Sequence, residues 1–342
     1  MSSAFDKLFE DPPDSPDSKL DLEGRVVGSF RIGTLIADQL VCQVYIAHDV
    51  LLDRPAALKI LKQNNWNGTD VSSRFRLEGR ILAKLRHPNI VQLYSFHEVD
   101  TMPCLAMEFI DGGTLADIIR NGALPVSTSI QVLLRIARAV AAAHRLGIIH
   151  RDLKPQNILI DSSIIEPALD TPVGFIKVAD FGIARILESL ESLTLTGMQP
   201  GTALYMAPEQ VEARSRDICP ATDVFSLGAI LYTMLTCESP FASDSVADSL
   251  QKIVLSDPPP LANLIPETPD WLIAVFQKCL AKDPRCRFQN AGELADAIAA
   301  NMSDDSRRSG VAFCGTASLT PLLLVIATMA VFVAAVYRLL MR

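Results

Sequence analysis

Three short motifs carry the residue types in this chain that could do chemistry. Residues 150–157 read His-Arg-Asp-Leu-Lys-Pro-Gln-Asn, residues 180–182 read Asp-Phe-Gly, and residues 207–209 read Ala-Pro-Glu. Carboxylate and amide oxygens are the ligands that hard cations such as Mg²⁺ prefer. A surface loop that is merely polar would not explain three such motifs in this order, so they predict a catalytic site.

The three motifs resemble the catalytic loop, the metal-binding segment and the end of the activation segment of eukaryotic-like serine/threonine protein kinases of the bacterial Hanks type. The resemblance covers residues 30–300 and implies a two-lobed α+β fold, with a small β-rich lobe and a larger helical lobe. It also implies transfer of the ATP γ-phosphoryl group to Ser or Thr of this chain and of protein substrates. Such transfer requires positioning and charge neutralisation rather than covalent chemistry.

The resemblance gives each polar residue of the catalytic loop a task. Asp152 accepts or orients the proton of the substrate hydroxyl, and Lys154 steadies the transferred phosphoryl group. Asn157 and Asp180 hold Mg²⁺, with Mn²⁺ as an alternative, while phosphates and waters complete the octahedron. ATP and a divalent cation are therefore the expected cofactors.

Lys59 interrupts the apolar residues 56–61, where an ammonium group without an anion would be costly. In the resembled family, the anions are the α- and β-phosphates of ATP and a glutamate on the following helix. Residues 74–85 predict that helix, with Glu78 at the expected distance from Lys59. Spacing alone would equally allow a solvated helix acid, but the His-Pro-Asn-Ile-Val at residues 87–91 favours the Lys59–Glu78 pair.

The loop that should cover the phosphates departs from the resembled family. There, the pattern Gly-x-Gly-x-x-Gly-x-Val lets backbone amides close over ATP. Counting back from Val44 puts Ala37, Gln39 and Cys42 at the three glycine positions, and Lys59 follows Val44 at the distance that the third strand requires. Side chains at these sites should hold the backbone away from the phosphates and limit positive φ angles. We therefore expect weakened nucleotide binding.

Short runs rich in β-branched and aromatic residues predict three antiparallel strands at residues 30–36, 41–48 and 56–62. Residues 105–113 resemble the fifth strand and the hinge between the lobes. A methionine at one strand position is more often a core residue than a ligand contact, so only the register points to Met107 as an adenine contact. The nucleotide contacts implied by the resemblance are Ala37, Gln39, Cys42, Val44, Ala57, Lys59, Met107, Glu108, Ile110, Asn157, Leu159 and Asp180.

Helices of the larger lobe are predicted at residues 115–120 and 129–146, the second of them long, rich in alanine and buried. Asp223 opens another buried helix, and the resemblance implies that its carboxylate hydrogen-bonds the backbone of the catalytic loop. The resemblance also implies a buried structural ion pair between Glu209 and Arg287.

Residues 180–209 resemble the activation segment of the same family. Arg151 precedes Asp152, and kinases with such an arginine commonly pair it with a phosphate on this segment. Bacterial members carry autophosphorylation sites near the positions of Thr194 and Thr196. Hydroxyl groups of an ordinary solvated loop would look the same, so regulation through these two residues is an expectation.

The composition argues against several other classes of protein. A net charge of −8 without a block of Lys or Arg lacks the electrostatic footprint of a nucleic-acid binder. Seven scattered cysteines without a Cys-x-x-Cys pair indicate reduced thiols rather than disulfides or a zinc site.

Residues 1–24 are acidic and rich in proline, which predicts a disordered lead without a cleavable signal peptide. Residues 161–174 predict a surface insertion.

The last part of the chain changes character. Residues 309–337 contain no charged side chain, and a membrane span needs ~20 apolar residues. A buried soluble helix could look similar, but the kinase-like region is complete by residue 300. We therefore expect a single-pass anchor in the cell membrane, with the ATP-dependent domain in the cytoplasm. The small residues Ala330 and Ala334 could pack two spans together as a homodimer.

The expected organisation has five parts along the chain. They are a disordered lead at 1–24, a small lobe at about 25–110 and a helical lobe at about 111–300 that together form the kinase domain, a linker at 301–318 and a transmembrane helix at 319–340.

Two other functions share parts of this pattern. A pseudokinase scaffold at the membrane would explain the missing glycines, but such a scaffold has no need for Asn157 and Asp180 as metal ligands. A small-molecule kinase would share the catalytic loop. The peptide-docking segment at residues 201–209 argues against it. Lys154, together with Gly201 and Thr202, resembles the serine/threonine-directed branch rather than the tyrosine-directed branch.

Overall fold

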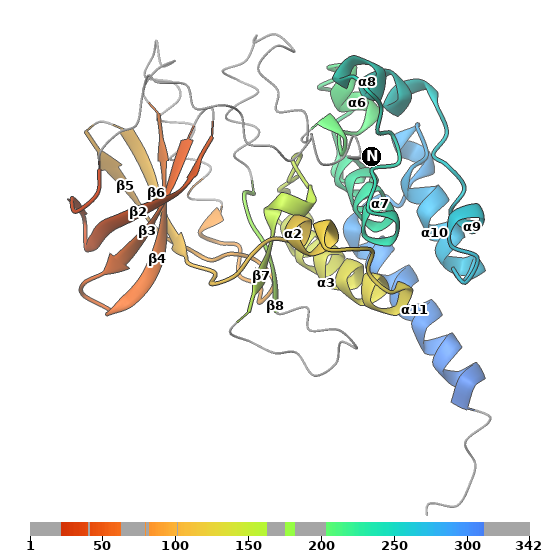
Figure 1. Cartoon of the computed structure of the whole chain (residues 1–342), viewed down its shortest axis with the longest axis horizontal. Helices are drawn as coiled ribbons and strands as arrows, with labels where there is room; N and C mark the ends of the chain where they lie inside the picture. Colours follow the sequence, from red (N-terminus) through yellow and green to blue (C-terminus); the bar gives the residue numbers. More distant parts are fainter. Residues whose placement is uncertain are drawn as a thin grey trace, which may run out of the picture. The chain divides into compact units, whose positions relative to one another are not determined.

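The computed structural model describes residues 22–39, 42–62, 79, 82–100, 102–162, 175–181 and 203–310, the last seven without their side chains. The chain divides into two units, Met1–Ala299 and Ala300–Arg342. The first unit holds a lobe built on one antiparallel sheet and a lobe built mainly of helices (Figure 1). This arrangement agrees with the predicted two-lobed fold.

The sheet lobe contains six described strands in the order β1-β2-β3-β4-β6-β5, and every neighbouring pair is antiparallel. The three strands predicted from the sequence correspond to β2, β3 and β4, because their alternating apolar residues suit a sheet with two unlike faces. The bounds are β1 (Val26–Val27), β2 (Phe30–Asp38), β3 (Cys42–Asp49), β4 (Arg54–Leu61), β5 (Leu93–Val99) and β6 (Met102–Glu108).

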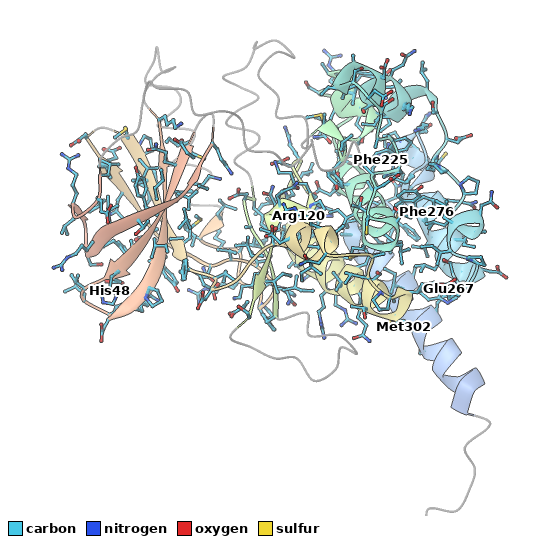
Figure 2. All side chains as sticks on the ribbon, in the orientation of Figure 1. His48, Arg120, Phe225, Glu267, Phe276 and Met302 are labelled. Carbon is cyan, nitrogen blue, oxygen red and sulfur yellow. The ribbon has the colours of Figure 1, made fainter. Side chains whose placement is uncertain are left out.

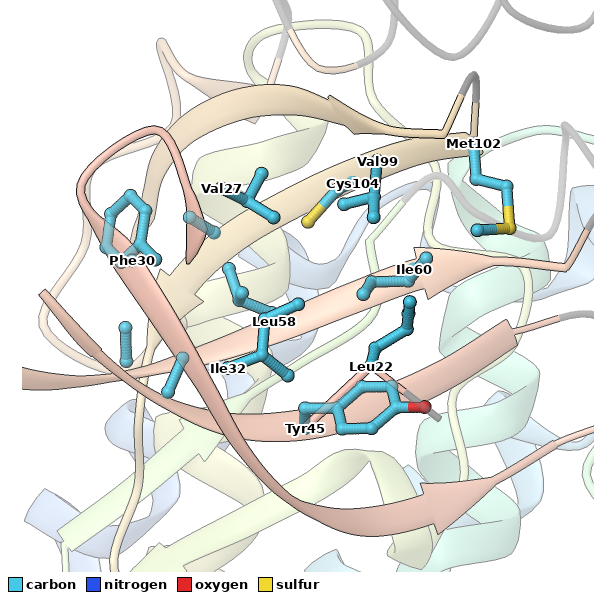
Figure 3. Close-up of a cluster of buried hydrophobic side chains, with 13 residues drawn as sticks. Leu22, Val27, Phe30, Ile32, Tyr45, Leu58, Ile60, Val99, Met102 and Cys104 are labelled. Carbon is cyan, nitrogen blue, oxygen red and sulfur yellow. The ribbon is translucent and has the colours of Figure 1, made fainter. Parts of the chain in front are cut away.

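One face of this sheet carries the larger apolar cluster, shown in Figure 3. Leu58 and Ile60 of β4 are fully buried there, together with Ile32 and Tyr45 from the neighbouring strands. Burying one such aliphatic side chain stabilises the fold by about 1.5–3 kcal/mol. Because side chains alternate along a strand, Lys59 between them must point to the other face.

The helical lobe is organised around α3 and α7, which pack against each other. Phe225 of α7 and Phe276 of α10 lie in its interior (Figure 2), and Tyr232 stacks on Phe276 with ring centroids 5.6 Å apart. The bounds are α2 (Leu115–Arg120), α3 (Val126–His144), α6 (Pro208–Val211), α7 (Pro220–Thr236), α8 (Val246–Leu255), α9 (Leu261–Leu264), α10 (Asp270–Cys279) and α11 (Ala291–Gly310).

Close contact between α7 and α10 depends on Gly228. A Cβ atom added there would lie 2.7 Å from the Cβ of Cys279, which is shorter than real contacts of this kind. Any larger residue would push the two helices apart, so Gly228 holds α7 in the position from which Asp223, on the same helix, reaches the catalytic loop.

Two short strands and a 3₁₀ turn lie between α3 and α6 along the chain. The 3₁₀ turn (Pro155–Asn157) leads into β7 (Ile158–Asp161), which pairs with β8 (Phe175–Val178). A second 3₁₀ turn (Pro284–Cys286) follows α10. The predicted insertion falls almost wholly outside the described residues.

The predicted membrane span, residues 319–340, lies outside the part of the chain that the structure describes. Among the described helices, α3 alone is long and apolar enough to cross a membrane, and it is the predicted core helix, 67% buried. Helix α11 continues to Gly310, well into the stretch 301–318 that the sequence predicted to be a linker.

Candidate active site

The β7–β8 hairpin brings two candidate metal ligands together. Ile158 at the start of β7 lies opposite Val178 at the end of β8. Asn157 therefore immediately precedes one strand while Asp180 closely follows the other. The amide of Ala179 donates a hydrogen bond to the carbonyl of Asn157 at 2.8 Å, which fixes this juxtaposition.

Asp152 lies between an amide and an ammonium group. Asn157 Nδ2 donates to the backbone oxygen of Asp152 at 2.7 Å and to its Oδ2 at 3.1 Å, and Lys154 Nζ lies 3.1 Å from the same Oδ2. The nitrogen of the Asn157 amide is thus committed to Asp152, and its oxygen is the atom that can bind a cation. The carboxylate of Asp152 is held as an acceptor beside a positive charge.

The catalytic loop and the Asp-Phe-Gly segment each contain a residue in an unfavourable backbone conformation. Arg151 has φ 66 and Asp180 has φ 63, a region that costs non-glycine residues of order 1–3 kcal/mol and that often marks functional sites. Asp223 supports the loop from α7, because its two carboxylate oxygens accept from the amides of His150 and Arg151 at 2.8 Å each. This is the contact that the resemblance implied for Asp223.

Asp223 itself is completely buried. Burial alone would raise the pKa of its carboxyl group, but the hydrogen bond and charge of His144 and the neighbouring His150 outweigh burial and lower that pKa. The Nε2 atom of His144 lies 2.8 Å from Oδ2 of Asp223. The carboxylate therefore remains ionised and can accept several hydrogen bonds at once.

The ring of His150 links the catalytic loop to the Asp-Phe-Gly segment. Its Nε2 lies 2.8 Å from the carbonyl of Ala179, while its Nδ1 accepts from the amide of Asp152 at 3.3 Å. The ring packs against Phe181 with centroids 4.6 Å apart. Sequence analysis gave His150 no role, since its partners are two backbone groups that only folding brings near.

Lys59 reaches across from β4 to Asp180, and their charged atoms lie 2.9 Å apart. Burial by itself would lower the pKa of Lys59, but the charge of Asp180 raises it above the usual value. Burial would raise the pKa of Asp180, and the charge of Lys59 lowers it instead. Both groups are therefore ionised, and Asp180 is an anion that meets the need of the buried lysine.

The register of the sheet places several predicted nucleotide contacts on one face. Val44 lies opposite Lys59, and Ala57 lies opposite Met107. Because Ala57 and Lys59 are two residues apart on β4, all four side chains point to the same side. The side chain of Cys42, two residues before Val44, points to the same side. This face of the sheet therefore covers a candidate nucleotide site.

Strands β2 and β3 stay paired up to the residues beside positions 40 and 41, which lie outside the described part of the chain. Ala37 pairs with Val44, and the amide of Gln39 donates to the carbonyl of Cys42 at 2.9 Å. The thiol of Cys42 donates to Oε1 of Gln39 at 3.1 Å. None of the three residues at the glycine positions has a positive φ, so the described part of this loop keeps strand-like backbone.

Cys42 is nearly inaccessible, with 3% of its surface exposed. Burial raises the pKa of its thiol, and the nearby charge of Lys59 only partly offsets that effect. The side chain is therefore a neutral thiol at physiological pH. It packs with Leu61 and Leu105 in a second, smaller apolar cluster.

Comparison with known proteins identifies this arrangement. The protein kinase domain family matches residues 40–298. The chain belongs to the protein kinase family. The prediction of a Hanks-type kinase with two lobes is thereby confirmed.

The relatives of this kinase include several bacterial enzymes. The chain is 36% identical to serine/threonine-protein kinase PknA of Mycobacterium tuberculosis over 80% of its own length and 61% of that relative. It is 36% identical to PknB of Mycobacterium leprae (79% of this chain, 42% of the relative) and 35% identical to PrkC of Bacillus subtilis (79% and 40%). The chain thus spans only part of each of these relatives.

Solved structures agree with the kinase fold. The kinase domain of Mycobacterium tuberculosis PknI matches with a TM-score of 0.62 at 23% identity, covering 81% of this chain and 98% of that one. Rad53 in complex with AMP-PNP matches with a TM-score of 0.63 at 26% identity, covering 79% of this chain and 64% of that one.

The predicted hinge segment is tied to the β7–β8 hairpin. The carboxylate of Glu108, at the end of β6, lies 2.7 Å from Nζ of Lys177 on β8. The same carboxylate accepts from the amide of Gln92, and the amide of Glu108 donates to the carbonyl of Gln92 at 2.9 Å. Ile110, the other predicted hinge contact, is buried. Sequence analysis missed Lys177, because an alternating strand residue gives no signal of its partner.

Arg287 and Glu209 form a buried ion pair at the Ala-Pro-Glu motif. The guanidinium of Arg287 binds both oxygens of Glu209 at 2.8 and 2.9 Å, and both side chains have 0% exposure. Thr222 donates a further hydrogen bond to Glu209. Such a pair is well satisfied, but removal of one partner would leave a buried charge.

The residues present fit a magnesium–nucleotide complex. The amide oxygen of Asn157 and the carboxylate of Asp180 are two oxygen donors placed side by side by the hairpin. Within the described ranges there is no group of three or more His, Cys, Asp or Glu side chains that could hold a metal alone. Phosphate and water oxygens would complete the shell of a hard cation, as Mg²⁺ requires.

Several predicted site residues lie outside the described residues. These are Glu78, the expected partner of Lys59, and Thr194 and Thr196 of the activation segment. Leu159 is described: it lies on β7, bridged to Thr114. The described structure shows Asp180 as a partner of Lys59 and leaves the Lys59–Glu78 pair as a prediction.

Proposed function

We propose that this chain is an ATP-dependent protein kinase that phosphorylates Ser or Thr of itself and of other proteins. One observation carries the proposal: Asp152, Lys154, Asn157, Asp180 and Lys59 form one continuous set of contacts, each no longer than 3.1 Å or bridged by a backbone hydrogen bond of 2.8 Å. Its relatives PknA, PknB and PrkC are serine/threonine-protein kinases, which supports serine and threonine as acceptors.

Each residue of this set has a task that follows from its contacts. The carboxylate of Asp152, 3.1 Å from Lys154 Nζ, can accept a hydrogen bond from a substrate hydroxyl and orient it. The ammonium of Lys154 can stabilise negative charge on the transferred group. Lys59 can bind phosphate oxygens when the carboxylate of Asp180 binds a metal cation instead of Lys59. Bound Mg²⁺ would neutralise phosphate charge between Asn157 and Asp180.

Phosphate incorporation tests the proposed reaction. The full chain, purified in detergent, should incorporate label from γ-labelled ATP and Mg²⁺, and Asp152→Asn should lower the rate on the order of 10²–10⁴-fold. Mass spectrometry of the labelled chain should find phosphate on Thr194 or Thr196, which could then pair with Arg151. Undiminished labelling of Asp152→Asn would exclude the proposed role of this residue.

A second candidate function is that of a pseudokinase scaffold, which transfers no phosphate. The observation that favours it is the contact between Gln39 and Cys42, whose side chains occupy glycine positions of the phosphate loop. A pseudokinase would bind ATP weakly or not at all even at millimolar ATP with Mg²⁺. Absence of both binding and labelling in the parent chain would establish this alternative.

We also propose that residues 319–340 anchor the chain in the cell membrane and leave the kinase domain, residues 25–300, in the cytoplasm. The uncharged composition of this stretch supports the anchor, and the need for ATP supports the cytoplasmic side. The full chain should sediment with membranes after carbonate treatment, whereas Val325→Arg with Met329→Arg should be released, because charges at mid-span are costly. Equal sedimentation of both chains would contradict the anchor.

A further inference from the structure

Gln210 lies directly after the Ala-Pro-Glu motif, and its side-chain amide makes two hydrogen bonds of opposite sense. Its Oε1 accepts from the amide of Ala207 at 3.0 Å, and its Nε2 donates to the carbonyl of Arg151 at 2.7 Å. Because the oxygen meets an N–H group and the nitrogen meets a carbonyl, the surroundings allow one orientation of this amide.

The carbonyl that Gln210 binds belongs to the strained part of the catalytic loop. Arg151 has φ 66, a conformation that side-chain-bearing residues avoid unless their surroundings impose it. Asp223 holds the amide of Arg151 from α7 at 2.8 Å. The two hydrogen bonds, one on each side of the Arg151 α-carbon, together impose this conformation.

The same peptide group determines where Asp152 lies. The carbonyl of Arg151 and the amide of Asp152 belong to one planar unit. Gln210 binds the carbonyl end, and Nδ1 of His150 accepts from the amide end at 3.3 Å. A rotation of this plane would turn the Cα–Cβ bond of Asp152 and displace its carboxylate from Lys154 and Asn157.

We propose that Gln210 is a positioning residue for Asp152, and that it couples the end of the activation segment to the catalytic loop through the carbonyl of Arg151. This inference rests on the proposed kinase function. Movement of the Ala-Pro-Glu segment would release the Arg151–Asp152 peptide, so Asp152 takes up its position only when that segment is in place.

The competing role for Gln210 is purely local. Its acceptor bond to Ala207 caps the start of α6 and would stabilise the segment without affecting catalysis. Two substitutions separate the roles. Gln210→Glu keeps an oxygen for the Ala207 amide but loses the donor and sets a carboxylate against the carbonyl of Arg151. Gln210→Met has a similar length and loses both hydrogen bonds.

The test measures kcat and the KM for ATP of the full chain in detergent. Gln210→Glu and Gln210→Met should both lower kcat, roughly ten- to a hundredfold as for a small displacement of a reacting group, with little change in the KM for ATP. Ser245→Ala is the matched control, because it removes the cap of α8, where Ser245 Oγ accepts from the amide of Asp248 at 3.0 Å. The control should keep the kcat of the parent.

A parent-like kcat in Gln210→Glu, with a loss only in Gln210→Met, would overturn the proposal and leave Gln210 as a cap. Hydrogen exchange supplies a readout that does not need activity. Amides of the peptide around residues 150–153 should exchange faster in both Gln210 variants than in the parent and in Ser245→Ala. If the parent transfers no phosphate, the proposed function fails, and unchanged exchange in this peptide would separately refute the role of Gln210.

Discussion

The two loops that border the candidate site differ in how their backbones are held. The catalytic loop keeps every polar residue of the family pattern, and a buried network from Asp223, His150 and Gln210 fixes its strained backbone. The loop between β2 and β3 has none of the three glycines, and the contacts between Gln39 and Cys42 in its described part lie within the loop itself.

This difference has a physical reason. Interactions that strengthen in the transition state determine kcat, whereas contacts made equally in the ground state and the transition state determine KM. Asp152 and Lys154 belong to the first kind. Backbone amides that contact the phosphates belong largely to the second kind. The sequence of this loop can therefore vary with a smaller effect on the chemical step.

Of the three further changes that test this comparison, the largest effect is expected at Asp180. Asp180→Asn removes the charge that pairs with Lys59 and that would bind the metal, so the rate of phosphate transfer should fall roughly a hundred- to a thousandfold. Initial rates with γ-labelled ATP give the measurement. Asp53→Asn, an exposed change in the turn between β3 and β4, is the control and should keep the parent rate. Comparable rates in both variants would mean that Asp180 does not act on the reaction.

The next largest effect concerns the support of the catalytic region. Arg287→Met leaves Glu209 buried without its partner and should lower the free energy of unfolding by about 3–5 kcal/mol. Chemical denaturation followed by circular dichroism checks this value. Arg285→Met, at an arginine with 88% side-chain exposure, should cost no more than about 0.5 kcal/mol. Equal losses in the two variants would show that the buried pair contributes no more to the free energy of unfolding than the exposed arginine does.

The smallest effect is expected in the loop between β2 and β3. Gln39→Gly combined with Cys42→Gly should lower the KM for ATP about fivefold, or ~1 kcal/mol if one net hydrogen bond to phosphate is regained. The change in kcat should be smaller. Gln39→Ala with Cys42→Ala removes the same thiol–amide contact without the freedom of glycine and is the matched control.

If the alanine pair lowers KM as much as the glycine pair, the side chains and not the backbone limit binding. If neither pair changes KM, the hairpin already admits ATP, and the contrast between the two loops has no effect on nucleotide affinity.

The sequence by itself determined the family, the order of the lobes and the candidate catalytic residues. Motif spacing places Asp152, Asn157 and Asp180, and the alternation of apolar residues predicts β2, β3 and β4, because both signals lie within short stretches of chain. The residues at the glycine positions could also be counted from Val44. These inferences need no knowledge of which distant residues meet.

Only the tertiary structure decided the partners. The pairing of Lys59 with Asp180, of Glu108 with Lys177, and of Gln210 with the carbonyl of Arg151 joins residues far apart in the chain. In the last case the acceptor is a backbone atom, which every residue has and which no sequence pattern marks. That contact helps to hold the positive φ of Arg151. This backbone conformation arises only when the helical lobe packs around the loop.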